Sequence, residues 1–135
     1  MLYKPKTQIG VGDVDISPLA HSFINDILKS RRITYGKYIS GFEQETARIH
    51  KVKYAIFCNS GTSALQVALH ALKSKYGWHD QDEVIVPALT FVATVNIVLQ
   101  NNLKPVFVDV DPHYFMLDPN KLESAITSKT RCMEF

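Results

Sequence analysis

The sequence predicts an α/β fold in which a mainly parallel sheet is connected by crossover helices. Apolar runs of strand length occur at 54–58, 84–86 and 105–110. Each run is followed by a segment whose apolar residues recur at helical spacing, at 62–74, 91–100 and 119–127. Strands that alternate with helices in this way favour parallel pairing, with the helices packed on the faces of the sheet.

Composition and charge narrow the class of protein. The chain has 135 residues, of which 46% are hydrophobic and 21% charged, so it can bury a core and disorder is not expected. The net charge of +2 is too small to indicate a nucleic-acid partner. The basic residues between positions 29 and 37 have Ile33, Tyr35 and Gly36 among them and are typical of a solvated loop.

Cysteine and histidine usage gives no sign of a metal site. Cys58 and Cys132 have neither disulfide-framework nor metal-ligand spacing, and the five histidines are scattered. The first residues lack the apolar core of a signal peptide, and no apolar run approaches membrane-spanning length. We therefore expect a cytoplasmic protein with no metal and no membrane contact.

The first fifty residues predict two helices that precede the sheet. Residues 1–17 have the composition of an irregular arm. A helix follows over 18–30, with Ser17 as its cap and Pro18 as its first residue. After a loop over 31–39, Ser40 and Glu43 have capping-box spacing and predict the start of a second helix.

The turn between the run 54–58 and the helix 62–74 is the first candidate site. A helix that begins after a Gly-containing turn directs unpaired backbone N–H groups and the positive end of its dipole outward. Ser60, Gly61 and Thr62 lie at this point, so a phosphate could be held there without lysine or arginine. The alternative is that Ser60 or Thr62 only caps a core helix.

The other strand ends carry two further candidates. Ligands of parallel sheets lie beyond the carboxyl ends of the strands, so the turns after each strand should converge. Asp109 and Asp111 could be a carboxylate pair for acid–base chemistry, but a Val-Asp-Pro strand exit favours turn chemistry. Phe91 could stack on a planar ligand or belong to the core.

Four ordered segments resemble one known family. They comprise 33–36 with 42–43, then 59–65, 82–94, and 105–112 with 117–119. Together they resemble the DegT/DnrJ/EryC1/StrS family of pyridoxal-phosphate-dependent sugar aminotransferases, which have the aspartate-aminotransferase (fold type I) architecture. The resemblance runs from about residue 19 to residue 131 and therefore covers nearly the whole chain.

The resemblance assigns roles to particular residues. It implies that Ser60, Gly61 and Thr62 hold the phosphate of pyridoxal 5'-phosphate and that Phe91 stacks on its pyridine ring. It leaves Asp109 structural, together with Asp111. The family's cofactor-binding lysine and the aspartate that pairs with the pyridine nitrogen lie further along than this sequence extends, so no catalytic residue is assigned.

The resemblance also implies an organisation and a function. Residues 1–50 would form an N-terminal arm with helices, and residues 51–135 an incomplete cofactor-binding large domain. The parent enzyme would transfer an amino group, with glutamate as the donor, to a keto group of a nucleotide-linked sugar for cell-surface polysaccharide biosynthesis. A homodimer is expected, as family members share active sites across an interface.

Three alternatives stay open. A dehydratase or aldolase-like enzyme could use the same fold. A truncated remnant could fold in part and catalyse nothing. A nucleotide-binding domain unrelated to pyridoxal phosphate is disfavoured, because the turn lacks a P-loop lysine and the three glycines of a dinucleotide fold.

The helix predicted over 119–127 should be followed by another parallel strand, for which very few residues remain.

Overall fold

The computed structural model describes residue 12 and residues 15–134. Two compact units follow one another, Met1–Ala55 and Ile56–Phe135. Most of the arm expected over residues 1–17 lies outside the described residues. In the part of the chain that the structure describes, every helix is too short or too polar to cross a lipid bilayer.

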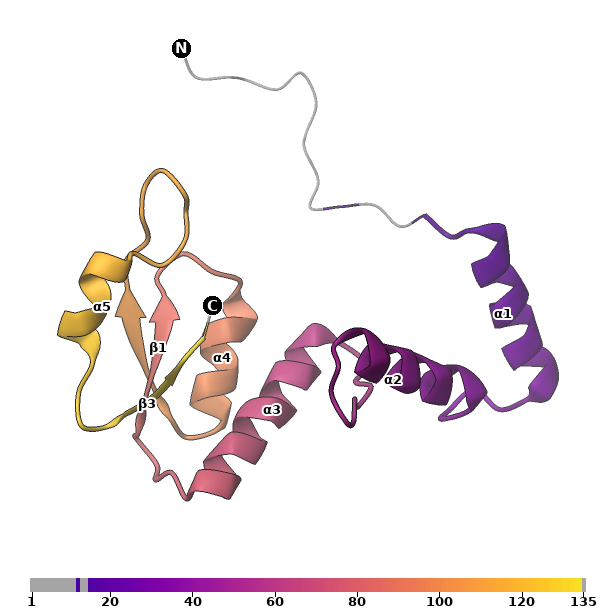
Figure 1. Cartoon of the computed structure of the whole chain (residues 1–135), viewed down its shortest axis with the longest axis horizontal. Helices are drawn as coiled ribbons and strands as arrows, with labels where there is room; N and C mark the ends of the chain where they lie inside the picture. The colour runs from indigo at the N-terminus through magenta and orange to yellow at the C-terminus, as the bar shows by residue number, and fades with distance from the viewer. Residues whose placement is uncertain (1–11, 13–14, 135) are drawn as a thin grey trace, which may run out of the picture. The chain divides into compact units, whose positions relative to one another are not determined.

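Two helices make up the described part of the first unit (Figure 1), α1 over Pro18–Ser30 and α2 over Lys37–Ile49. The Ser17 hydroxyl accepts a hydrogen bond from the Ala20 N–H at 3.2 Å, and Pro18 is the first helical residue. Helix α1 ends at Arg31, whose φ of 56° turns the chain out of the helix. The predicted bounds and cap of this helix are confirmed.

Helix α2 begins earlier than its sequence predicted. The N-cap is Gly36, which makes no side-chain cap, and Ser40 lies inside the first turn, where its N–H donates to the Gly36 carbonyl at 3.0 Å. The capping-box prediction at Ser40 was therefore wrong. The first turn is held by contacts with α1 instead, since Lys37 and Tyr38 both reach the Asp26 carboxylate, at 2.6 and 2.7 Å.

The second unit alternates helices with three parallel strands (Figure 1). Its elements in chain order are α3 Gly61–Tyr76, β1 Glu83–Pro87, α4 Val92–Gln100, β2 Lys104–Val108, α5 Pro119–Ala125 and β3 Thr130–Met133. The strand order is β2-β1-β3, and β1 pairs in parallel with both neighbours. The predicted α/β fold with a parallel sheet and crossover helices is confirmed.

The segment 54–58 is not a strand, contrary to its apolar sequence. It has no regular secondary structure, and Tyr54 and Ile56 are 73% and 79% exposed. A strand requires a neighbour that accepts and donates its backbone hydrogen bonds. Among the described residues, both neighbours of β1 are other strands and no segment pairs with 54–58. Apolar content alone therefore did not determine its structure.

The strand expected after the last helix is present and short. β3 has four residues and pairs with β1 through Glu83 with Thr130, Val84 with Cys132 and Ile85 with Met133. The register shifts between the first two of these pairs. Beyond β3, the Glu134 N–H still donates to the Ile85 carbonyl at 2.9 Å, so the chain continues alongside β1.

The core of the second unit lies between β1 and the helices on one of its faces. Helix α4 packs on β1 and β2, α3 packs on α4, and α5 packs on β2. The cluster comprises Leu69, Val84, Val86, Ile97, Val98 and Leu103. Because side chains alternate along a strand, Ile85 faces the opposite side of the sheet, where it is also fully buried. β1 is therefore the buried centre of the unit.

Candidate functional site

The site expected from the sequence lies at one edge of the second unit. Figure 1 shows that α3 and α4 run against the direction of β1 and β2, so both helices begin on the side where these strands end. The carboxyl edge of a parallel sheet is where ligands of such folds bind. The turn before α3 and the turn before α4 therefore lie on the side where ligands of such folds bind.

Ser60 is the N-cap of α3. Its extended backbone ends the preceding segment, and its hydroxyl accepts a hydrogen bond from the Ser63 N–H at 3.1 Å. The same hydroxyl donates to the Ser63 side-chain oxygen at 3.0 Å, and the Ser60 carbonyl accepts from the Ala64 N–H. The capping alternative is thus realised in the geometry.

Capping leaves donors available for an anion. Within the described residues, the N–H groups of Gly61 and Thr62 have no hydrogen-bond partner, and neither does the Thr62 hydroxyl. The space beside Gly61 is open, since a Cβ placed on it would meet nothing within 4 Å. Helix α3 has 16 residues, so its dipole adds positive potential at these N–H groups. This set of donors fits a phosphate.

Phe91 is the N-cap residue of α4 and is 73% exposed. The alternative that it belongs to the core is therefore wrong for the described residues, because its ring has no core around it. Helix packing involves other residues of α4, since Ala93, Thr94, Ile97 and Val98 are buried. The ring is therefore exposed to a flat ligand, as the role that the family resemblance implies would require.

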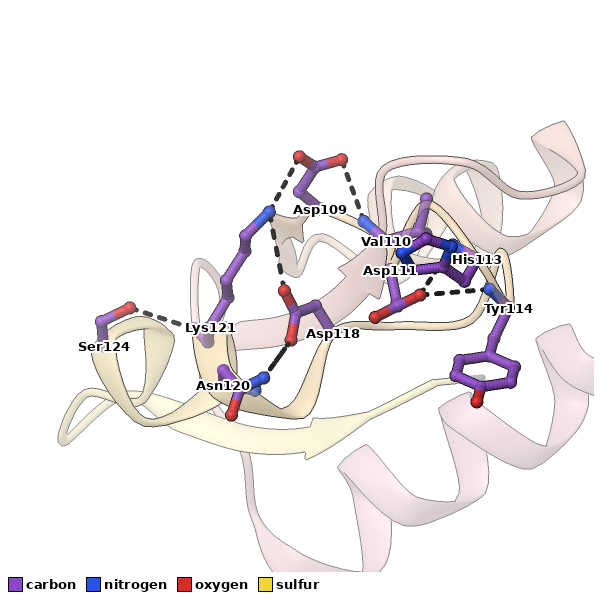
Figure 2. Close-up of polar contacts among 9 residues, drawn as sticks. All are labelled: Asp109, Val110, Asp111, His113, Tyr114, Asp118, Asn120, Lys121 and Ser124. Carbon is purple, nitrogen blue, oxygen red and sulfur yellow. Dashed lines mark hydrogen bonds and ion pairs between the residues drawn. The ribbon is translucent and has the colours of Figure 1, made fainter.

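Asp109 and Asp111 have the turn chemistry that the strand exit favoured. The Asp111 carboxylate accepts hydrogen bonds from the His113 and Tyr114 N–H groups at 2.7 and 3.1 Å, as Figure 2 shows. The Asp111 N–H donates to the Met116 carbonyl, and Val110 bridges antiparallel to Leu117. Residues 109–118 therefore form a small hairpin at the end of β2, which we call the 109–118 hairpin.

Lys121 ties the base of this hairpin to α5. Its ammonium lies 3.0 Å from the Asp109 carboxylate and 3.7 Å from the Asp118 carboxylate, between the two groups in Figure 2. The hydrogen bond from Lys121, together with the Val110 N–H, lowers the pKa of Asp109, and the same bond raises the pKa of Lys121. Asp109 is therefore bonded to Lys121 and to the Val110 N–H in the turn that follows β2.

One polar pair at this edge was not predicted from the sequence. The Thr90 hydroxyl donates to the Thr94 hydroxyl at 3.1 Å, across the first turn of α4. Two threonines four positions apart at a predicted helix start were the available signal. No metal centre is present in the described ranges, because no three histidine, cysteine or carboxylate side chains gather there.

Fold and site together define a class of protein. The second unit is an α/β domain that presents a helix N-terminus with open donors at the carboxyl edge of its parallel sheet. The chain belongs to the DegT/DnrJ/EryC1/StrS aminotransferase family, whose model matches residues 15–133. The resemblance found in the sequence motifs is confirmed.

Relatives and solved structures agree with this family. The chain is 46% identical over 98 residues to the GDP-perosamine synthase of Caulobacter vibrioides, covering 73% of this chain and 25% of that protein. It is 42% identical over 108 residues to the UDP-2-acetamido-2-deoxy-3-oxo-D-glucuronate aminotransferase of Pseudomonas aeruginosa, covering 76% of this chain and 29% of that protein. The chain thus spans less than a third of the length of these relatives.

This chain also matches a solved structure, that of the E. coli GDP-4-keto-6-deoxy-D-mannose-3-dehydratase with bound hydrated PLP. The TM-score between the two structures is 0.83 at 29% sequence identity, and the match covers 91% of this chain and 32% of that chain. The likeness confirms the expected fold type I architecture. The family and this ligand-bound neighbour together imply pyridoxal phosphate as the cofactor.

Proposed function

We propose that this chain is the N-terminal portion of a pyridoxal-phosphate-dependent aminotransferase that acts on a nucleotide-linked keto sugar. Glutamate is the proposed amino donor. The parent enzyme is proposed to act in the cytoplasm, where its product would be used for cell-surface polysaccharide biosynthesis. Family membership over residues 15–133 supports the reaction class, and the two relatives named above support the nucleotide-linked substrate. The observation that carries the proposal is the open donor set at the start of α3.

Four residues of this chain would hold the cofactor. Ser60, Gly61 and Thr62 would bind its phosphate through the free N–H groups and hydroxyl described above, and Phe91 would stack on its ring. When bound, pyridoxal phosphate supplies an electron sink for the bonds that break at the amino-bearing carbon. The chain's own residues bind and orient the group, and none of them is assigned a proton transfer.

We further propose that the chain alone does not transaminate. The residues that the family resemblance assigns to catalysis are not among these 135 positions. Asp109, which follows β2, accepts a hydrogen bond from Lys121, and this bond lowers its pKa. Purified chain with glutamate and added pyridoxal phosphate should form keto acid no faster than free cofactor does.

A homodimer is proposed for the parent enzyme, and the first unit supplies the surface. Within its described residues no side chain is buried, and α1 exposes Leu19, Phe23, Ile24 and Leu28. These residues lie on a helix that has no core of its own to cover. Phe23 packs on the Tyr38 ring at a centroid distance of 4.9 Å, but the face stays largely exposed, which is typical of a segment that packs on another chain or domain.

A dehydratase is the second candidate function, and one observation favours it. The E. coli dehydratase named above matches 91% of this chain at a TM-score of 0.83. The two activities share the cofactor site, so the described residues do not separate them. The residue of the parent gene at the position of the family's cofactor-binding lysine distinguishes them: lysine supports the aminotransferase, and another residue supports the dehydratase.

Binding of pyridoxamine 5'-phosphate tests the cofactor site directly. This probe keeps the phosphate and the ring but lacks the aldehyde, so it cannot react with surface lysines. Backbone amide NMR of the labelled chain should show shifts at Gly61, Thr62 and Phe91 on titration. Pyridoxamine, which lacks the phosphate, is the matched control and should leave the Gly61 and Thr62 amides unchanged. Binding that leaves these two amides unmoved would refute the proposed phosphate site.

A further inference from the structure

Helix α4 begins without the side-chain cap that most helices have. Its N-cap residue is Phe91, with φ −69° and ψ 140°, which carries no side-chain oxygen and makes no cap hydrogen bond. Helix α3, in contrast, is capped by the Ser60 hydroxyl. Because uncapped first turns leave N–H groups unsatisfied and fray, the conformation of Phe91 needs another constraint.

The Thr90 and Thr94 side chains supply that constraint. Their hydroxyl oxygens lie 3.1 Å apart and close a loop from the residue before Phe91 to the third residue of the helix. On the inner side, the Thr94 N–H donates to the Phe91 carbonyl at 3.0 Å. Thr94 is only 7% exposed, so one end of this bridge is anchored in the core of the unit. The backbone at Phe91 is thus constrained by two hydrogen bonds, one between the threonine side chains and one at its own carbonyl.

The constraint matters because, among the described residues, no core packing holds the Phe91 side chain in place. The residue is 73% exposed, so packing does not choose its rotamer, and backbone geometry alone sets where the Cα–Cβ bond points. A ring that must stack on a flat ligand binds more tightly when its direction is fixed before binding. A frayed first turn would leave the ring to be ordered at the moment of binding.

We propose that Thr90 and Thr94 are positioning residues, whose hydroxyl bond fixes the backbone at Phe91 and so directs its Cα–Cβ bond toward the place where the ring stacks on the pyridine ring of the cofactor. This inference rests on the proposed function. It predicts that the bridge acts only on ring stacking and leaves the phosphate turn at Ser60 unaffected. Neither threonine is required to touch the ligand.

The test compares two probes on the full 135-residue chain. Thr90→Val removes the exposed hydroxyl, and Thr90→Ser is the matched control that keeps it. We expect Thr90→Val to weaken pyridoxamine 5'-phosphate about threefold, below the roughly tenfold loss expected for Phe91→Ala, on the scale of one aromatic contact. Inorganic phosphate should bind every variant equally, because it uses only the start of α3. Thr90→Ser should behave as the wild type.

A double variant separates positioning from a general loss of stability. With Phe91 already replaced by alanine, Thr90→Val should cause no further loss of affinity, because no ring remains to be positioned. Thr94→Val and Thr94→Ser repeat the comparison from the buried end of the bridge. Additive losses in the double variant, or a fall in phosphate affinity, would overturn the proposal.

Amide hydrogen exchange gives a readout that needs no ligand. Thr90→Val should speed exchange of the Thr94 amide, and Thr90→Ser should not. An unchanged exchange rate would also overturn the proposal. Failure of the proposed function looks different: the wild-type chain would then bind neither probe, and the role assigned to the Phe91 ring would fall with it.

Discussion

The Asp82 carboxylate and the Arg131 guanidinium form a two-point ion pair, with nitrogen–oxygen distances of 2.7 and 3.1 Å across 49 positions of sequence. The pair joins the residue before β1 to the middle of β3. Next to it, the Glu83 carboxylate accepts from the Thr127 hydroxyl at 2.5 Å and from Lys104 at 3.0 Å. The amino edge of the sheet is thus held by polar contacts on both sides of β1, opposite the edge that carries the candidate site.

Replacement of Arg131 should lower the melting temperature in proportion to the bonds lost. Arg131→Lys keeps the charge but loses the fork that contacts both carboxylate oxygens, so we expect a smaller fall than for Arg131→Gln. Circular dichroism measures the transition. Arg48→Gln is the control, because Arg48 pairs with Glu45 at the exposed surface of α2 and such pairs contribute little. Equal transitions for Arg131→Gln and wild type would contradict the expectation.

Acid should destabilise the second unit through the same carboxylates. The Arg131 side chain and the His79 N–H lower the pKa of Asp82, and the Thr127 hydroxyl and Lys104 lower that of Glu83. A carboxylate whose pKa is lowered by folding stabilises the fold fully above its unfolded pKa of about 4. That stabilisation is lost as the pH falls through the lower, folded value.

Urea unfolding at a series of pH values measures this dependence. We expect a midpoint that is constant above about pH 5 and falls steadily below about pH 4. Asp82→Asn should reduce the slope in the acid range, because the amide does not titrate. A slope equal to that of the wild type would show that other groups govern the acid transition.

Truncation of Ile97 tests the core beneath α4. The residue is 1% exposed and belongs to the cluster that joins α4 to β1. Ile97→Ala should cost about 2–5 kcal/mol of unfolding free energy, because it removes buried methyl groups and leaves a cavity. Leu99→Ala on the same helix is the control, since Leu99 is 53% exposed. Denaturant titration of the two variants should separate them clearly, and similar losses would argue against this packing.

Two substitutions of Ser60 separate capping from anion binding. Ser60→Ala removes the cap and should cost about 1 kcal/mol of stability. Ser60→Asp keeps an acceptor for the Ser63 N–H but places a negative charge where a phosphate would lie. We expect Ser60→Asp to melt like the wild type and to bind pyridoxamine 5'-phosphate about tenfold or more weakly. A Ser60→Asp chain that binds normally would leave the residue with a capping role only.

The 109–118 hairpin depends on the Asp111 side chain. Asp111→Ala removes two hydrogen bonds to backbone N–H groups, whereas Asp111→Asn keeps an oxygen that can accept them. Tyr114 and Phe115 are exposed at the tip and are cleavage sites for chymotrypsin. Cleavage there should be about fivefold faster in Asp111→Ala than in Asp111→Asn. Equal rates would show that Asp111 does not hold the hairpin.

Local signals predicted the elements that local chemistry controls. Ser17 and Pro18 predicted the start of α1, and the apolar run 84–86 predicted the buried central strand. The strand exit at Asp111 predicted the turn hydrogen bonds that its side chain accepts. The start of α2 could not be found in this way, because its first turn is held by Asp26 of another helix. Pairing of 54–58 likewise depends on a neighbouring strand, which local sequence does not report.

The candidate site was also predictable only where it depends on local sequence. The turn at Ser60 is a continuous stretch of sequence, so the cap and the free N–H groups follow from spacing. The exposure of Phe91 could not be predicted from the sequence, because an aromatic residue at the start of a helix can be either buried or exposed. The roles of these residues in cofactor binding stay predictions until the titrations above are made.

The position of β1 has a consequence for how the chain acquires its structure. Its partner β2 is close in sequence, with Glu83 and Lys104 only 21 positions apart, whereas Thr127 at the approach to β3 is 44 positions from Glu83. Closing the shorter loop costs less chain entropy, and non-local pairing is slow. We therefore expect the β1-α4-β2 unit to nucleate and β3 to dock last, so that the turn bearing Phe91 is already shaped when the third strand joins the sheet.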